Sequence, residues 1–182
     1  MKIETPRLVL REFREDDLAA VREYDGDPVV RRYEPPIPTE DDTREYIRKA
    51  YLWAQEHPRT HFRFAIAVRP DDRARGRITL TLLNADIREW EIGWMLHAAE
   101  WGHGYATEAG AAVLRLAFEE LGAHRVVAFC NEGNAASVRV MEKLGMTREG
   151  HFRASRPWQD GWADEYLYAI LDREWANLSA RS

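Results

Sequence analysis

Two glycines flank a histidine where a helix is about to begin, in the segment WGHGYATEA at residues 101–109. A helix start offers unpaired amide hydrogens and the positive end of the helix dipole, and glycine lets a ligand approach the backbone closely. Such a turn favours an anion, most naturally a pyrophosphate. A tight strand-to-helix turn that needs glycine only for its dihedral angles explains the same residues. Short glycine motifs leave both interpretations open.

The pattern around this turn predicts a mixed architecture. Alternating apolar and polar residues predict strands, and apolar residues at helical spacing between caps and glycines predict helices. The predicted strands are 8–13, 62–68, 76–83, 91–96 and 125–130, followed by a terminal pair around a loop at 154–162. The predicted helices are 16–24, 39–55, 105–121 and 134–144, with a short tail helix. This order indicates one α/β (α+β) domain over residues 1–182.

Composition argues against several classes of partner. The formal net charge is −5 and no long basic run is present, so nucleic acid, whose binding depends on neutralising phosphates, is not an expected partner. The chain lacks both a signal-peptide-like start and a run of roughly 18 apolar residues, so we expect a cytoplasmic protein with no membrane partner. Cys130 is the single cysteine, and its apolar neighbours predict a buried thiol. Arginines mixed with acids, as in REFREDD (11–17), predict solvated faces.

Two other phosphate-binding motifs fit the glycine turn poorly. A Walker loop needs Gly-Lys-Ser/Thr, and none follows Gly104. A dinucleotide fingerprint needs a third Gly or Ala where Thr107 stands, and it needs the turn to follow the strand directly. Here residues 97–101 separate the strand from the first glycine. A nicotinamide-dependent oxidoreductase is therefore a weak alternative.

Three segments occur in an order and at a spacing that belong to one known family. They are TPRLVLR near the start, EIGWML followed by EWGHGYATEA, and NEGNAASVRVMEKLGMTREG. On these segments, which cover nearly the whole chain, the sequence resembles the GNAT family of N-acetyltransferases, in the branch of the ribosomal-protein alanine N-acetyltransferases.

The resemblance implies a particular fold. It is a mixed, mostly antiparallel sheet of about six to seven strands, flanked by helices and splayed between its fourth and fifth strands. Those two strands are 91–96 and 125–130, which should be parallel neighbours. The 29 residues from 97 to 125 leave room for the helical crossover that a parallel pair needs.

The resemblance also implies acetyl-coenzyme A as the cosubstrate. Amides of residues 102–107 would hold its pyrophosphate, and its pantetheine arm would bond to the backbone at residues 95–97. The implied cofactor contacts are Met95, Leu96, His97, Gly102, His103, Gly104, Tyr105, Ala106, Thr107, Asn134 and Ser137. His97 and His103 lack partners at metal-ligand spacing, and Pro58 breaks the helix that would align His57 with His61, so no metal is expected.

Acetyl transfer to an amine needs a neutral nucleophile, support for the developing oxyanion and a proton for the departing thiolate. Neutralising an α-amine at pH 7 costs about 1 kcal/mol, whereas a free lysine costs roughly 4–5 kcal/mol. Glu91 is the candidate base, acting through a water, and a structural glutamate is an equal alternative. The resemblance implies that Ser137 donates a hydrogen bond to the sulfur or the pantetheine. Without the resemblance, Ser137 is interpreted as an ordinary serine in the first turn of a helix. Asn134 is expected to be a helix cap as well as a pantetheine contact.

Aromatic residues mark the expected acceptor side. Tyr33 in the loop at 27–38, Trp94 and Trp158 are candidates for a pocket wall, although most aromatics are core or edge cover. The acceptor is a protein N-terminal amine or a small-molecule amine, and the residues leave that choice open. A homodimer is a family expectation. A coenzyme A binding regulator without catalysis is the alternative hypothesis.

Overall fold

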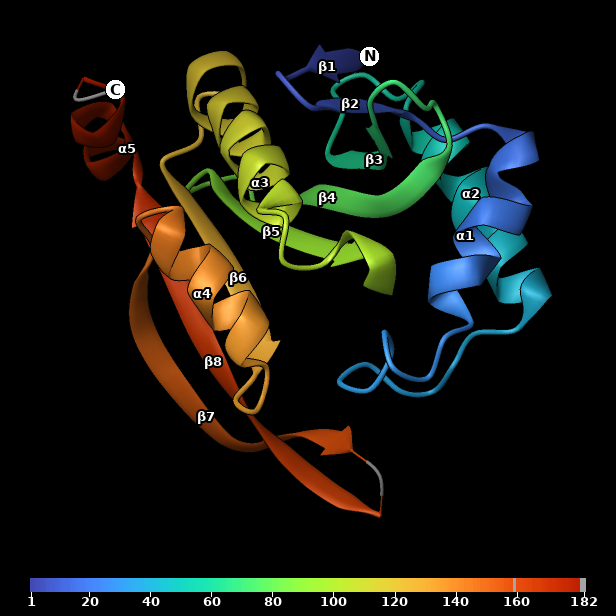
Figure 1. Ribbon diagram of the computed structural model, residues 1–182. Helices are drawn as coiled ribbons and strands as arrows, with labels where there is room; N and C mark the ends of the chain where they lie inside the picture. Colours follow the sequence, from blue (N-terminus) through green and yellow to red (C-terminus); the bar gives the residue numbers. More distant parts are fainter. Residues whose placement is uncertain (159, 181–182) are drawn as a thin grey trace.

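The computed structural model describes residues 1–158 and 160–180, which build one open eight-stranded sheet with helices on both faces (Figure 1). The strand order is β1-β2-β3-β4-β5-β6-β8-β7. The strands are β1 (Lys2–Glu4), β2 (Leu8–Glu12), β3 (His61–Val68), β4 (Ala74–Asn84), β5 (Glu89–Leu96), β6 (Arg125–Asn131), β7 (Thr147–Trp158) and β8 (Gly161–Leu171). The helices are α1 (Leu18–Asp25), α2 (Glu40–Trp53), α3 (Tyr105–Arg115), α4 (Ala135–Lys143) and α5 (Asp172–Ser179). Shorter helical turns lie at Glu15–Asp17, Ala98–Glu100 and Leu116–Glu120.

Neighbouring strands pair antiparallel except β5 and β6, which are parallel. Their ladder ends at Glu91 and Val127, although β5 continues to Leu96 and β6 to Asn131. Beyond that point the strands diverge, and Figure 1 shows β4 and β5 turning away from β6 and β8. The parallel, splayed pair is therefore confirmed. It involves the fifth and sixth strands because β1, too short for alternation to reveal, precedes the predicted ones.

The side chains of β3 show how the helices divide between the two faces of the sheet. Phe62, Phe64 and Ile66 belong to the larger hydrophobic cluster, which includes residues of α3 and α4. Ala65 belongs to a second cluster that includes residues of α1 and α2. Since adjacent strand residues point to opposite faces, α3 and α4 cover one face, and α1 and α2 cover the other. In Figure 1, α3 and α4 accordingly lie in front of the sheet.

The predicted caps set several helix boundaries. The Thr39 side chain accepts a hydrogen bond from the Asp42 amide, and the Asp42 carboxylate accepts one from the Thr39 amide, which starts α2. The Asn134 side chain caps α4 through the Ser137 amide. These two predicted caps are confirmed.

The C-terminal hairpin is longer than predicted. β7 continues to Trp158 and β8 begins at Gly161, so most of the predicted loop at 154–162 is strand. Pro157 fits there because β7 is the edge of the sheet, where one side of the strand needs no ladder bond. A register shift between Phe152 and Arg156, with Ala154 at φ 50°, absorbs the turn-favouring residues.

Part of the segment REFREDD is buried rather than solvated. Arg11 and Asp17 are each 5% exposed, and the guanidinium donates to both Asp17 oxygens at 2.7 and 2.8 Å. The prediction of a solvated face is wrong for these two residues, because their bidentate pair removes the usual reason for a charge to stay in water.

A second buried charge cluster fastens the end of α1 to β4. Asp25 is 3% exposed, and its carboxylate accepts hydrogen bonds from Arg77 at 2.8 Å and from Arg31 at 3.3 Å. Arg77 also lies over the ring of Tyr46 in α2. The cluster holds together α1, α2, β4 and the loop that follows α1.

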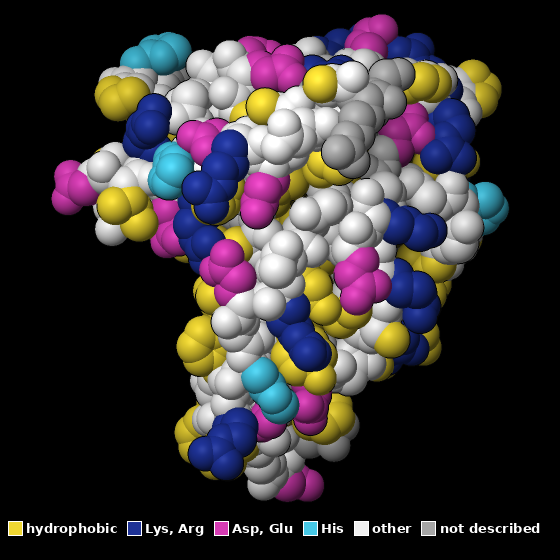
Figure 2. Space-filling model, turned by 90° about the vertical axis from the view of Figure 1, so that its left-hand side faces the viewer, with side chains coloured by type: hydrophobic (Ala, Val, Ile, Leu, Met, Phe, Trp, Pro, Cys, Tyr) yellow, Lys and Arg dark blue, Asp and Glu magenta, His cyan; other side chains and the backbone are white. Residues whose placement is uncertain are grey.

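The surface carries charges of both signs. In the face drawn in Figure 2, basic and acidic side chains are interspersed, and the narrow lower part is the β7–β8 hairpin. Among the helices in residues 1–158 and 160–180, none has the length and apolar character needed to span a bilayer.

Candidate active site

A cavity of about 250 Å³ opens where β5 and β6 diverge. Five residues singled out from the sequence line it together: Tyr33, Glu91, Trp94, Asn134 and Ser137. They come from the loop after α1, from β5 and from the start of α4. The fork in the sheet thus gathers the proposed catalytic residues and two of the proposed acceptor residues.

The cavity wall also contains charged and polar residues that the sequence analysis missed. They are Glu34, Asn131, Arg156 and Glu165. Glu34 directly follows Tyr33 in the loop at 27–38, and this position beside a candidate residue is the signal that could have identified it. Arg156 and Glu165 lie on the hairpin strands, where no motif signalled them. The Arg156 guanidinium donates to Glu165 at 2.9 Å, which leaves the wall with an excess of carboxylates.

Glu91 occupies the point of the fork. It pairs with Val127 in the last rung of the β5–β6 ladder. Burial raises the pKa of its carboxyl, the nearby Arg156 lowers it, and Glu165 raises it again, with a net rise. Within residues 1–158 and 160–180 the carboxylate has no hydrogen-bond or ion-pair partner. A carboxylate with this environment can accept a proton from a water or an amine in the cavity.

Ser137 lies in the first turn of α4. Its amide donates to the Asn134 side chain at 3.2 Å, so the backbone there is fixed by the cap. Ser137 lines the cavity, and its hydroxyl has no hydrogen-bond partner in the part of the chain that the structure describes. The hydroxyl is therefore available to donate to a group bound in the fork.

The glycine turn lies at the start of α3, outside this cavity. Gly102 and Gly104 both have φ of +80°, the left-handed region that favours glycine, and Gly104 is the N-cap of α3. The first amide of the helix with a backbone acceptor is that of Glu108, which donates to the Gly104 carbonyl. Across residues 1–158 and 160–180, no acceptor serves the six amides of residues 102–107. Such a row of unpaired amides at a helix start suits a phosphate group.

The expected backbone contacts of the pantetheine arm, residues 95–97, lie at the end of β5 and just after it, past the end of its ladder with β6. Met95 and Leu96 are buried, and the Trp101 indole donates to the Leu96 carbonyl at 3.0 Å. The His97 amide donates to Arg75 on the β4 side, and the His97 ring accepts from the Ala99 amide. Because strand backbone groups alternate between the two edges, those of Leu96 face away from β4, and with its carbonyl taken by Trp101 the Leu96 amide remains for an extended ligand.

Tyr33 and Trp158 fasten the loop at 27–38 across the fork. The Tyr33 hydroxyl donates to the Gly133 carbonyl at 2.8 Å, just before α4. The Trp158 indole donates to the Arg32 carbonyl at 3.0 Å. Tyr33 and Trp94 line the cavity, whereas Trp158 supports the loop from the hairpin and is not among the lining residues.

Cys130 lies in the cavity wall but is only 8% exposed. Burial, with a further contribution from the nearby Glu165, raises the pKa of its thiol to about 11. The predicted buried thiol is confirmed, and at neutral pH it is a poor nucleophile because little thiolate forms.

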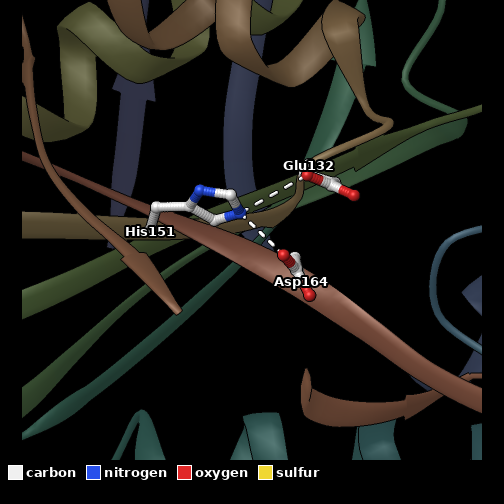
Figure 3. A group of neighbouring side chains, drawn as sticks. All are labelled: Glu132, His151 and Asp164. Atoms are coloured by element: carbon white, nitrogen blue, oxygen red, sulfur yellow. Dashed lines mark hydrogen bonds and ion pairs between the residues drawn. The ribbon is translucent and has the colours of Figure 1, made fainter. Parts of the chain in front are cut away.

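A separate cluster of titratable side chains lies beside the loop between β6 and α4 (Figure 3). His151 Nε2 is 2.8 Å from Asp164 and 3.4 Å from Glu132. The Ala154 amide and His151 hold the pKa of Asp164 below its usual range. These ligand atoms lie within 4.8 Å of one another, a spacing that a metal also accepts, but the hydrogen bond between His151 and Asp164 accounts for the two groups that lie nearest each other. None of the three was singled out from the sequence.

Comparison with known proteins identifies the fold. Residues 7–147 match the family model of the acetyltransferase (GNAT) domain. The chain belongs to the GNAT acetyltransferase family. The uncharacterized N-acetyltransferase YnaD of Bacillus subtilis is 38% identical over 176 residues, which cover 96% of this chain and 99% of YnaD.

Solved structures agree with this assignment to the GNAT family. A GNAT acetyltransferase from Bacillus anthracis superposes with a TM-score of 0.83 at 36% identity, covering 95% of this chain and 99% of that one. RimL, a ribosomal L7/L12 alpha-N-protein acetyltransferase in complex with coenzyme A, gives a TM-score of 0.83 at 18% identity, covering 94% and 98%. The second likeness shows the shared fold. This GNAT protein is an acetyl-coenzyme A dependent acyltransferase, and the nicotinamide alternative falls away.

The residues of the site fit the cosubstrate of the GNAT family. The unpaired amides of residues 102–107 suit its diphosphate, and the open edge of β5 suits an extended pantetheine arm. Ser137 and Glu91, whose hydroxyl and carboxylate have no hydrogen-bond partner in the described part of the chain, line the cavity at the fork.

Proposed function

We propose that this GNAT enzyme transfers the acetyl group of acetyl-coenzyme A directly to a primary amine, either a protein N-terminal α-amine or a small-molecule amine. The observation that carries the proposal is the row of six backbone amides without acceptors at the start of α3, beside a fork in the sheet. The amides of Gly102 to Thr107 hold the diphosphate. The edge of β5 at Met95 to His97 and the start of α4 at Asn134 direct the thioester into the fork.

Glu91 and Ser137 divide the chemistry within the fork. The Glu91 carboxylate takes a proton from the attacking amine, through a water. The Ser137 hydroxyl donates to the sulfur as negative charge develops on it. Tyr33 and Trp94 form part of the acceptor wall, and Trp158 holds the loop that carries Tyr33.

The charge of the cavity wall supports an amine as acceptor. Glu34, Glu91 and Glu165 face the cavity with a single arginine, Arg156. A net negative wall attracts a protonated amine before it loses its proton. RimL provides a protein-terminus precedent at the level of fold only. The homodimer and the cytoplasmic location stay predictions.

The deciding experiment measures free thiol released from acetyl-coenzyme A across a panel of peptides with free N-termini and small amines. Thermal shift with coenzyme A runs beside it, since a ligand at 100 times its Kd stabilises by about 2.7 kcal/mol. We expect stabilisation together with amine-dependent thiol release. Stabilisation without turnover on any amine favours the alternative, a coenzyme A binding regulator, and the absence of both contradicts the proposed site.

Replacing Glu91 by glutamine is expected to slow turnover about tenfold for an α-amine and roughly 100-fold for a lysine-like amine. The difference arises because the lysine-like amine holds its proton more tightly. Glu91 works deprotonated, and burial raises its pKa, so its contribution is lost as pH falls through that raised value. In a plot of log kcat/KM against pH, protonation of the amine substrate gives one bend. Protonation of Glu91 should give the wild type a second bend at lower pH, below which the slope is steeper, and the variant should lack this second bend. Identical profiles would remove Glu91 as the base.

Replacing Ser137 by alanine is expected to lower kcat about tenfold, because a hydrogen bond to a charged group contributes roughly 1.5 kcal/mol or more. The Kd for coenzyme A should change less than about twofold. Ser137→Thr, which keeps the hydroxyl, is the matched control and should retain most activity. Steady-state kinetics with calorimetric binding separate the two quantities. Full activity in the alanine variant contradicts the role.

A further inference from the structure

Arg7, at the entrance to β2, makes four contacts with the glycine turn and the first turn of α3. Its Nε donates to Glu108 at 2.6 Å, and its backbone amide donates to the same carboxylate at 2.9 Å. Its NH1 donates to the His103 carbonyl at 2.9 Å. Its guanidinium also lies over the Tyr105 ring, 4.8 Å from the centroid. A residue about 100 positions earlier in the chain thus contacts the turn at its centre.

The bond to the His103 carbonyl fixes the direction of the next amide. The peptide that joins His103 to Gly104 is planar and trans, so its C=O and N–H point in opposite directions. Because Arg7 holds the carbonyl, the Gly104 amide is directed away from Arg7. With φ of +80° at both glycines and their high intrinsic freedom, little else in the turn restricts this peptide plane.

The bond to Glu108 settles a charge conflict at the same place. The Glu108 carboxylate lies in the first turn of α3, with a side chain only 15% exposed. Burial raises its pKa, but hydrogen bonds from Thr5 and Arg7 outweigh burial and lower it, so the group is charged. An unpaired carboxylate there would repel a diphosphate at the neighbouring amides. Arg7 neutralises it.

We propose that Arg7 is a positioning residue for the diphosphate of acetyl-coenzyme A: it aims the Gly104 amide and cancels the charge of Glu108. The inference rests on the proposed function, because it assumes that the amides of residues 102–107 receive the diphosphate. Arg7 acts through the backbone and through Glu108, and it leaves the chemistry at the fork to other residues.

The binding affinities of three ligands test the role. Coenzyme A and 3′-dephospho-coenzyme A carry the diphosphate, and their binding is measured by calorimetry. Pantetheine lacks the diphosphate, and its binding is measured by NMR titration. We expect Arg7→Gln to weaken binding of the first two about tenfold, about 1.4 kcal/mol, and to change pantetheine binding less than about twofold. Arg69→Gln is the matched control, since Arg69 is an exposed arginine that pairs with a glutamate of the N-terminal segment, Glu4. It should bind all three ligands like the wild type.

Two further measurements distinguish the effect of Arg7 on the direction of the Gly104 amide from its effect on the charge of Glu108. Arg7→Gln/Glu108→Gln should recover about threefold of the lost affinity, because the uncompensated carboxylate is gone. In the ligand-free protein, the backbone amide order parameters of residues 102–107, measured by NMR relaxation, should be lower in Arg7→Gln than in the wild type, because the turn loses the contact that restricts it. Equal loss for pantetheine, an unchanged coenzyme A affinity, or equal order parameters would each overturn the proposal. If the wild type bound no coenzyme A, the proposed function itself would fail, while the order parameters would still decide whether Arg7 fixes the turn.

Discussion

Replacing Gly104 by valine is expected to weaken coenzyme A binding about 100-fold while the fold survives. At φ +80° a β-branched residue is strongly disfavoured, so the turn must change its backbone conformation. A side chain at this position meets only Arg7, at 3.6 Å, so the cause is the backbone rather than crowding. Losing two amide contacts to a charged diphosphate costs about 3 kcal/mol, which is roughly 100-fold in Kd.

Gly122→Val is the matched control for this prediction. Gly122 has φ of +64° at the far end of the same helical segment, and a Cβ there meets only an arginine side chain, Arg88, at 4.0 Å. Backbone strain in Gly122→Val should lower the free energy of unfolding by about 1–2 kcal/mol, as in Gly104→Val, and should leave coenzyme A binding unchanged. Urea unfolding and calorimetry measure the two effects. Equal coenzyme A affinity in Gly104→Val and the wild type would show that the turn does not hold the diphosphate.

Replacing Asp25 by alanine is expected to lower the free energy of unfolding by about 3–5 kcal/mol, a large share of a domain's stability. The change leaves Arg77 and Arg31 without their shared carboxylate, and both side chains are only 13% exposed. Removing one partner of a buried pair costs more than the pair contributes, because the remaining charge stays desolvated. Denaturant unfolding followed by circular dichroism gives the value.

Glu45→Ala is the matched control for Asp25. Glu45 pairs with Arg48 on the exposed face of α2, where an ion pair contributes less than about 1 kcal/mol. Asp25→Leu/Arg77→Met should recover part of the loss, because apolar residues of similar size often replace a buried pair without penalty. A loss below about 1 kcal/mol in Asp25→Ala would show that the cluster is not a main support of α1.

Local patterns in the sequence predicted the elements that depend on neighbours in the chain. The capping box at Thr39 and the crossover between β5 and β6 each depend on residues a short distance apart. The resemblance located the fork, and with it Glu91 and Ser137 on the cavity wall.

Contacts between distant segments could not be predicted in this way. Arg7 and Glu108 are 101 positions apart, and each alone looks like an ordinary surface charge. Arg156 lies in the segment expected to form a loop and reaches the cavity from β7, whereas Glu165 reaches it from β8. Asp25 directly follows the predicted helix at 16–24, and only the fold reveals that two arginines donate to its carboxylate. Such pairs depend on three-dimensional packing, which periodicity does not encode.

The outer strand of the hairpin has a consequence for the solubility of the protein. β7 presents a twelve-residue open edge, which is a template for pairing with another chain and hence for aggregation. Pro157 removes a donor from that edge, the register shift near Ala154 breaks its regular spacing, and the arginines of β7 add repulsion between copies. The irregularities that made the last residues of β7 look like a loop therefore also keep this edge from recruiting further strands into fibrous or amorphous assemblies.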